Sequence, residues 1–265
     1  MPLSIPFRNP LAYPAGVAMG IDLSHPAAGA TLWSIAATGN GLISVLQGTR
    51  RTGTVAPSYA PSIIGPAGLF SGGNVDQFSN VPFAAGVTTF TIAAIILPTS
   101  LTGNTNVFNY GSGGTGVGIL SVSGALRVDY PGVGNVTSGI SMTNNVPQAV
   151  FISRNAVPNT NFVIANLQTG QVITATSGSA TAGVAPATRL DIGNGGFGFW
   201  TGYIACCMFS ARYLSMPELL KWAADPWSFW YPRRPSYNVA AAAAGGAFPW
   251  WAVDNNLGVI GAGTY

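Results

Sequence analysis

Charged residues are scarce in this chain. They make up 6% of its 265 residues, with 10 basic against 7 acidic side chains and a net charge of +3, where ordinary soluble proteins carry about 25%. Nucleic-acid binding needs a dense basic patch, and the only adjacent basic pairs are Arg50-Arg51 and Arg233-Arg234. We expect each pair to be a salt bridge or a solvated edge, and we predict no nucleic-acid partner. Because 48% of the residues are hydrophobic, we also expect other protein to cover much of the surface.

Acids and imidazoles are too few for most hydrolytic chemistry. Glycan-cleaving enzymes use a pair of carboxylates, whereas Glu218 is the only glutamate and the aspartates stand far apart in the sequence. His25 is the only histidine, and no Gly-x-Ser-x-Gly nucleophile turn is present. We therefore predict a protein that is not an enzyme and binds no cofactor. Glu218 is expected to cap a helix, and His25 to be a turn or packing residue.

Cysteine and long apolar runs are also scarce. Cys206 and Cys207 are adjacent, and neighbours on a strand point to opposite faces, so we expect two small buried side chains that do not form a disulfide. With a single histidine they offer no zinc-ligand spacing. The longest apolar run, near Ile92 to Leu97, is far shorter than a membrane span, so we predict no membrane partner.

The N-terminus has no apolar signal-peptide core. Prolines at positions 2, 6, 10 and 14 interrupt the first residues, together with Arg8. We therefore expect synthesis and retention in a cytosol.

Short apolar runs separated by turn residues dominate the middle of the chain, from about residue 65 to 214. Examples are Val117 to Val122 and Leu126 to Tyr130, which are separated by Ser123-Gly124. Glycine is dense at Gly111 to Gly118 and at Gly193 to Gly198, as hairpin ends require. Short strands at this spacing predict an all-β fold, an antiparallel two-sheet sandwich or a barrel.

The end of this region combines a strand with a helix. Residues 202 to 209 are apolar at both alternating sets of positions, which predicts a central strand with both faces buried. Ser215 and Glu218 have capping-box spacing, with Pro217 in the first turn. We predict a short helix over 216 to 224 that ends at Asp225-Pro226.

This closing unit resembles a known family. A Gly-x-Ile-Ala strand from 202, Leu-Ser-x-x-Glu at 214 to 218, Asp-Pro-Trp at 225 to 227 and Pro-Arg-Arg at 232 to 234 are similar to the end of concanavalin A-like, laminin-G-like jelly-roll domains of tailed-bacteriophage virion proteins. Phe70 to Asn74, Phe90 to Pro98 and Ser24-His25-Pro26 agree with the same pattern. The resemblance covers roughly residues 65 to 235. It implies a jelly-roll sandwich and a virion assembled in the host cytoplasm.

We divide the chain into three parts: an extended N-terminal arm at 1–64, the jelly-roll domain at 65–235 and a C-terminal arm at 236–265. The aromatic cluster around Trp222 and Phe229 is interpreted as core or interface packing in preference to a sugar-stacking surface. The C-terminal aromatics are expected to anchor on a neighbouring subunit or to fold back on their own domain. The candidate protein-interface residues are Trp227, Trp230, Tyr231, Arg233, Arg234, Phe248, Trp250 and Trp251.

Two functions follow from this interpretation. The first is a non-enzymatic structural protein of the virion, a homo-oligomeric capsid decoration or head-fibre subunit bound to other virion proteins. The alternative is a tail-fibre adhesin that recognises host surface glycan through the loops at Gly111 to Gly118 or Gly193 to Gly198. The resemblance also suggests a rim calcium site near Asp76 and Asp191, but calcium requires more acidic ligands than this chain offers. We therefore predict no metal.

Overall fold

The computed structural model describes residues 21–38, 41–44, 57–79, 81, 86–111, 116–130, 134–155, 159–178, 189–194 and 198–230. All of them belong to the compact unit Met1–Pro232. The elements are the 3-10 turn η1 (Ala28–Ala30), β1 (Thr31–Thr38), β2 (Gly41–Ser44), β3 (Ser58–Ser62), β4 (Gly65–Ser71), β5 (Asp76–Ser79), β6 (Phe90–Ser100), β7 (Asn104–Tyr110), β8 (Val117–Val122), β9 (Ala125–Tyr130), β10 (Gly134–Ser141), β11 (Gln148–Arg154), β12 (Asn159–Asn166), β13 (Val172–Gly178), β14 (Arg189–Ile192), β15 (Thr201–Ser210) and α1 (Met216–Ala224).

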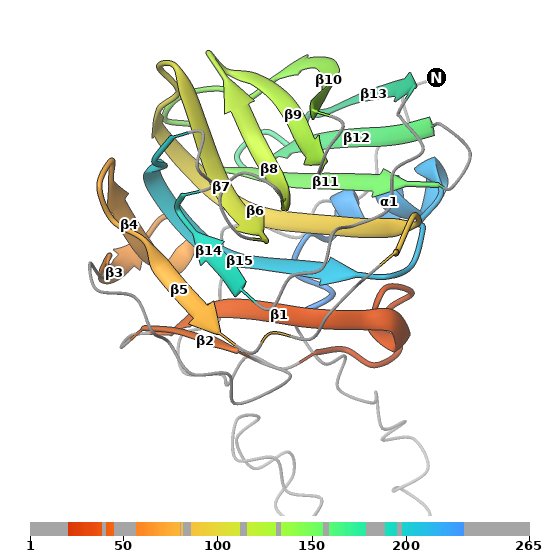
Figure 1. Ribbon diagram of the computed structural model, residues 1–265, viewed down its shortest axis with the longest axis horizontal. Helices are drawn as coiled ribbons and strands as arrows, with labels where there is room; N and C mark the ends of the chain where they lie inside the picture. Colours follow the sequence, from red (N-terminus) through yellow and green to blue (C-terminus); the bar gives the residue numbers. More distant parts are fainter. Residues whose placement is uncertain are drawn as a thin grey trace, which may run out of the picture. The chain divides into compact units, whose positions relative to one another are not determined.

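The strands form two sheets that face each other (Figure 1). The first sheet has the order β13-β12-β11-β6-β15-β1-β2, and β4 also pairs with β15 and with β3. The second has the order β10-β9-β8-β7-β14-β5. The strand pairs are antiparallel, as in the register of β15 with β6 and with β1. The predicted antiparallel two-sheet jelly-roll sandwich is confirmed.

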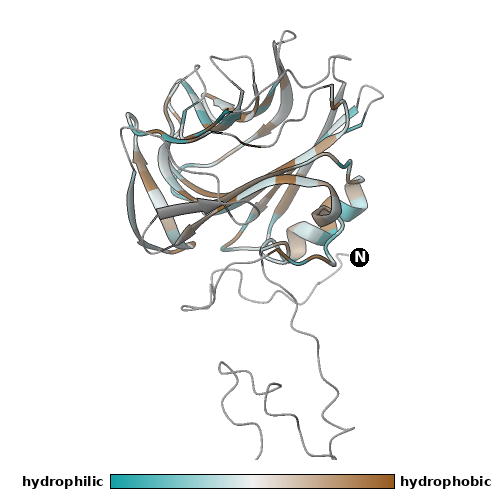
Figure 2. Ribbon diagram, turned by 60° about the horizontal axis from the view of Figure 1, so that its bottom comes forward, coloured by the Kyte–Doolittle hydropathy of each residue, from teal (hydrophilic) through white to brown (hydrophobic). Residues whose placement is uncertain are grey.

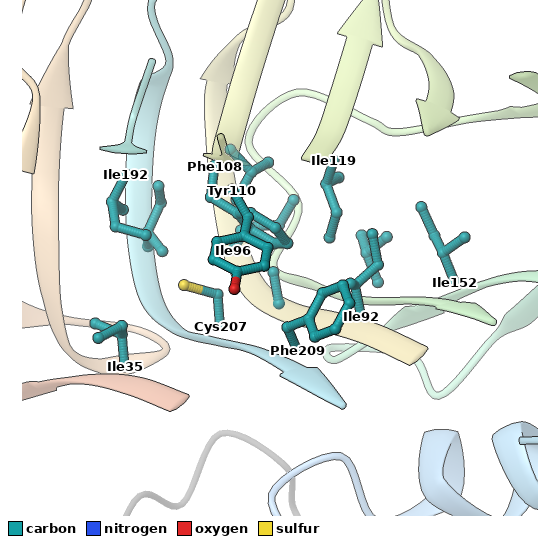
Figure 3. Packing of buried hydrophobic residues seen from close by; sticks show 14 of the residues in the cluster. Ile35, Ile92, Ile96, Phe108, Tyr110, Ile119, Ile152, Ile192, Cys207 and Phe209 are labelled. Atoms are coloured by element: carbon teal, nitrogen blue, oxygen red, sulfur yellow. The ribbon is translucent and has the colours of Figure 1, made fainter. Parts of the chain in front are cut away.

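The main core lies between the two sheets. Phe209 on β15 contacts Tyr110 on β7 at 5.3 Å between ring centroids, and Trp33 on β1 contacts Phe108 at 5.1 Å. Figure 3 shows Phe209 and Cys207 of β15 together with Tyr110, Ile119 and Ile192 of the facing sheet. The core therefore joins β1, β7 and β15, which are far apart in the sequence.

A second apolar cluster lies on the outer face of the first sheet, beneath α1 (Figure 2). Cys206 belongs to this outer cluster and Cys207 to the core between the sheets, and both are fully buried. Each thiol is free. These positions confirm the prediction that β15 is a central strand with two buried faces.

Helix α1 begins with the predicted capping box. The Ser215 backbone N–H donates to Glu218 Oε2 at 2.7 Å, and Pro217 occupies the first turn. Leu219 and Trp222 are buried on the side of the helix that faces the sheet. Within the described part of the chain, no helix is long and apolar enough to cross a membrane.

The prediction of an extended arm through residue 64 is wrong for the part that the structure describes. β1 pairs with β15 and β3 pairs with β4, so both belong to the first sheet. Trp33 and Ile35 of β1 point into the core between the sheets, while Ala36 belongs to the outer cluster. The alternation of β1 is hard to recognise in the sequence because Ser34, Ala36 and Ala37 are small and contrast little with one another. Residues 1–20 lie outside the described residues.

The turn before η1 packs against the segment that follows α1. The His25 ring lies 4.4 Å from the Trp222 ring and 5.4 Å from the Phe229 ring, and the Ala27 N–H donates to His25 Nδ1 at 3.2 Å. The Asp22 N–H donates to the Phe229 carbonyl at 2.9 Å. The structure thus confirms His25 as a packing residue.

Candidate functional site

Trp227 and Trp230 are not on the surface of this chain, although the sequence suggested them as interface residues. Trp230 is fully buried and Trp227 is 6% exposed, and both belong to the cluster beneath α1. The Trp230 Nε1–H donates to the buried Ser34 hydroxyl at 3.0 Å. These two interface assignments are therefore wrong. The core alternative, which the sequence also allowed, is the one that the structure supports.

The other candidate interface residues cannot be placed. Tyr231, Arg233, Arg234, Phe248, Trp250 and Trp251 lie outside the described residues, so their assignment to an interface stays a prediction.

Asp76 and Asp191 lie on neighbouring strands, where Ile192 pairs with Asp76 and Asp191 pairs with Gln77. Asp191 Oδ1 accepts from Gln77 Nε2 at 2.9 Å and from Arg189 Nε at 2.8 Å. The Tyr59 hydroxyl donates to Asp76 Oδ2. Both carboxylates are buried and hold strands together. Among the described residues, no group of three or more His, Cys, Asp or Glu side chains lies close enough to hold a metal ion.

A small pocket opens where β10 of the second sheet approaches β13 of the first, at the side of the sandwich where Figure 1 shows these two strands. Its volume is about 70 Å³. Its walls combine hydroxyl and carboxamide side chains with aliphatic ones, and none of them is charged. The lining residues, which we call the β10–β13 pocket, are Ser141, Thr143, Val146, Gln148, Ile164, Asn166, Gln171 and Ile173.

Gln148 is a buried polar residue of the β10–β13 pocket. It points to the same face of β11 as Val150, toward the space between the sheets, because residues two apart share a face. Its Nε2 donates to the carbonyls of Thr143 at 2.8 Å and Val146 at 3.3 Å. Carbonyls only accept hydrogen bonds, so this pair of contacts fixes which end of the carboxamide is oxygen. The Gln148 Oε1 is buried and has no hydrogen-bond partner.

Hydrogen-bonded turns hold the walls of this pocket in place. Asn166 Oδ1 accepts from the backbone N–H groups of Gln168 at 2.9 Å and Thr169 at 3.1 Å. The Asn166 N–H donates to the Gln171 carbonyl at 2.8 Å. On the other side, the N–H of Asn145, whose φ is +59°, donates to the Pro98 carbonyl at 2.7 Å. Two turns that are held by hydrogen bonds therefore form part of the pocket walls.

A second surface lies on the glycine-dense loop before β15. Phe199 is 43% exposed there, and the neighbouring Gly198 carbonyl accepts from the Asn106 N–H of β7 at 3.3 Å. Glycine is required at 198 because its φ is +158° and a Cβ would lie 1.9 Å from the Asn104 carbonyl oxygen. Residues 195–197 and 112–115 lie outside the described residues, so the two predicted glycan-binding loops are described only in part.

The β10–β13 pocket leaves no recognisable signal in the sequence. Its residues are common uncharged types from four segments, and no motif links them. The turn at Thr169-Gly170 was recognisable from its residue types. Its approach to the turn after β10 depends on how the two sheets pack.

Only solved structures show a likeness to this chain, and that likeness concerns the fold. No protein-family model matches the sequence, and no curated protein sequence matches it. The binding domain of botulinum neurotoxin serotype G is similar in structure, with a TM-score of 0.55, 15% identity, and coverage of 76% of this chain and 53% of that one. The binding domain of botulinum neurotoxin DC in complex with SialylT has a TM-score of 0.54 and 14% identity, with 74% and 51% covered.

A third similar structure is domain 4 of AbnA, a GH43 extracellular arabinanase from Geobacillus stearothermophilus, in complex with arabinotriose. Its TM-score is 0.54 at 12% identity, and the match covers 73% of this chain and 98% of that domain. This chain spans about half the length of the neurotoxin binding domains. At these identities the likeness concerns the fold alone.

Proposed function

We propose that this chain is a non-enzymatic glycan-binding domain of a virion surface protein, and that it recognises host glycan through the β10–β13 pocket. The observation that carries the proposal is the chemistry of the pocket walls. Hydroxyl and carboxamide groups from Ser141, Thr143 and Gln148 stand beside the aliphatic side chains of Ile164 and Ile173. Sugars present hydroxyls next to apolar C–H groups, so such walls suit them.

The similar structures support a sugar ligand. The arabinanase domain binds arabinotriose, and one neurotoxin binding domain was solved with SialylT. For botulinum neurotoxin type C, cell entry depends on interaction with two ganglioside molecules. These ligands belong to those proteins, and the shared sandwich makes a sugar-binding role reasonable for this chain.

The use of the scarce catalytic residue types supports a non-enzymatic role. Glu218 caps α1, and the His25 ring packs on Trp222. The virion setting is proposed from the resemblance of the closing strand-helix unit to phage virion domains. The expected cytoplasmic assembly belongs to the same proposal.

The second candidate is a structural virion subunit, a capsid decoration or head-fibre protein packed against its neighbours. The scarcity of charge favours it, because 6% charged residues leave a surface that suits burial against protein. The two candidates differ in what happens when the pocket is blocked. A decoration protein keeps its place in the particle and binds no glycan, whereas an adhesin loses its attachment to cells.

The experiment begins with the purified full chain on a glycan array, followed by calorimetry on each glycan that binds. Thr143→Trp fills the pocket with an indole, and the Thr143 carbonyl that accepts from Gln148 stays in place. Thr137→Trp is the matched control, because Thr137 is an exposed threonine of β10 that does not line the pocket.

We expect Thr143→Trp to weaken glycan binding at least tenfold and Thr137→Trp to leave it unchanged. Undiminished binding in Thr143→Trp contradicts the pocket assignment. If Phe199→Ala is the variant that loses binding, the site is the loop before β15. A wild-type chain that binds no glycan but is incorporated into particles supports the structural role.

A further inference from the structure

We infer that β13 is a self-association edge, at which two copies of this chain join their first sheets into one continuous sheet. The inference does not depend on the glycan-binding function. It follows from the outward backbone groups of β13, from the features that the other sheet edges have and β13 lacks, and from a register in which the strand is complementary to itself.

β13 lies at the end of the first sheet and, among the described strands, pairs with β12 alone (Figure 1). The Asn166 N–H donates to the Gln171 carbonyl where this pairing begins. Residue pairs that exchange hydrogen bonds alternate with pairs that do not in an antiparallel ladder. The backbone N–H and C=O groups of alternate residues therefore point away from β12, and these residues are Val172, Thr174, Thr176 and Gly178. Each offers one donor and one acceptor to a further strand.

β10 of the second sheet comes close to β13 but does not occupy this edge. Ala175 of β13 packs against the core between the sheets, as do Val136 and Ile140 of β10, so β10 contacts the inward face of β13. Thr174 and Thr176, which point to the other face, are exposed. Within the described part of the chain, no backbone hydrogen bond joins β10 to β13.

The other sheet edges have features that prevent strands from pairing between molecules. Such features are a bulge, a proline or a very short strand. The register of β10 shifts between Thr137 and Ser141, β3 contains Pro61, and β2 and β5 have four residues each. β13 has seven residues, no proline and a regular register with β12. Charged side chains also protect edges, but the sequence has none between Arg154 and Arg189.

A second β13 fits this edge because the strand is complementary to itself. When two copies run antiparallel about a two-fold axis at Ala175, Thr174 of each copy lies opposite Thr176 of the other. Val172 then lies opposite Gly178, so every outward backbone group of β13 is paired. Threonine pairs across strands stabilise antiparallel sheets, and an uncharged strand meets no like charge in its own copy.

The first experiment measures self-association of the purified full chain by sedimentation velocity over a concentration series. A single pair of short strands is a small interface, so we expect a dimer that dissociates on the order of 10 µM. Thr174→Lys places a charge on the edge, and Thr174→Pro removes an outward N–H without touching the hydrogen bonds to β12. Thr99→Lys is the matched control, because Thr99 is an exposed threonine of β6, which pairs on both sides.

We expect both Thr174 variants to weaken dimerisation at least tenfold and Thr99→Lys to leave it unchanged. Far-ultraviolet circular dichroism of each variant checks that the sandwich is folded. A wild-type chain that stays monomeric at about 100 µM, well above the expected dissociation constant, overturns the inference. A dimer that both Thr174 variants retain overturns it as well.

The second experiment tests the register. At the two-fold axis, the two copies of Ala175 form a pair without hydrogen bonds, whose Cα atoms are about 4.5 Å apart, within the range that a disulfide spans. Cys206 and Cys207 are buried and do not compete. We expect mild oxidation of Ala175→Cys to give a covalent dimer on a non-reducing gel, and Thr99→Cys to remain monomeric.

A dimer that is sensitive to Thr174→Lys but is not cross-linked through Ala175→Cys would overturn the register centred on Ala175. A monomeric wild-type chain whose Thr174→Lys variant is excluded from particles would show that another virion protein, and not a second copy, adds its strand to β13.

Discussion

Replacing Trp230 with alanine tests whether this residue holds the domain together or serves an interface. Trp230 is fully buried in the cluster beneath α1, where its ring lies 5.1 Å from Phe229 and 6.1 Å from Trp222. Its indole N–H donates to Ser34 on β1. The side chain thus joins the segment after α1 to the N-terminal strand of the first sheet.

The magnitude follows from this burial. A large aromatic side chain buries about 150–250 Å², which at about 25 cal/mol per Å² is about 4–6 kcal/mol, and measured Trp-to-Ala losses in cores are about 3–5 kcal/mol. The Ser34 hydroxyl, also fully buried, loses its donor at a further cost of about 1 kcal/mol. We expect a loss of about 5 kcal/mol, which is a large fraction of the stability of a typical domain.

The assay is urea unfolding at equilibrium, followed by far-ultraviolet circular dichroism. With a slope of about 2–3 kcal/mol per molar urea, the midpoint should fall by about 2 M. Leu220→Ala, at a 40%-exposed position of α1, is the control and should cost less than about 1 kcal/mol. An unchanged midpoint for Trp230→Ala, together with loss of self-association or of incorporation into particles, would refute the core assignment and restore the interface one.

Two further predictions concern titratable groups. The hydrogen bond from the Ser215 N–H lowers the pKa of Glu218, so its stabilising contribution is present above the unfolded pKa of about 4.3 and is lost as pH falls through the lower folded value. The difference in unfolding free energy between wild type and Glu218→Gln, measured by urea titration from pH 7 to pH 2, should therefore shrink toward acid, and a constant difference would contradict the capping role. Burial raises the pKa of the Cys206 and Cys207 thiols. We therefore expect neither thiol to react with iodoacetamide at pH 8 in the folded protein and both to react in urea, as measured by mass spectrometry. Rapid alkylation of the native chain would show that β15 opens.

The sequence by itself determined the features that depend on neighbours along the chain. Alternating apolar sets at 202 to 209 identified a central strand, because a strand exposes its two faces at alternate residues. Ser215 and Glu218 identified the start of α1, because the capping box needs only residues three apart. Glycine-rich turns and short apolar runs indicated a sandwich or a barrel, and the resemblance of the closing unit to jelly-roll domains favoured the sandwich.

Only the tertiary structure decided what covers each of these faces. The sequence shows that Trp222 and Trp230 are apolar and close to other aromatic residues. It does not show that Trp230 donates to Ser34 or that Trp222 packs on His25, each about 200 residues earlier in the chain. The β10–β13 pocket exists because β10 of one sheet meets β13 of the other. A periodic hydrophobic pattern indicates which face of a strand or helix is buried. The element that shields it is chosen by long-range packing, which leaves no local trace in the sequence.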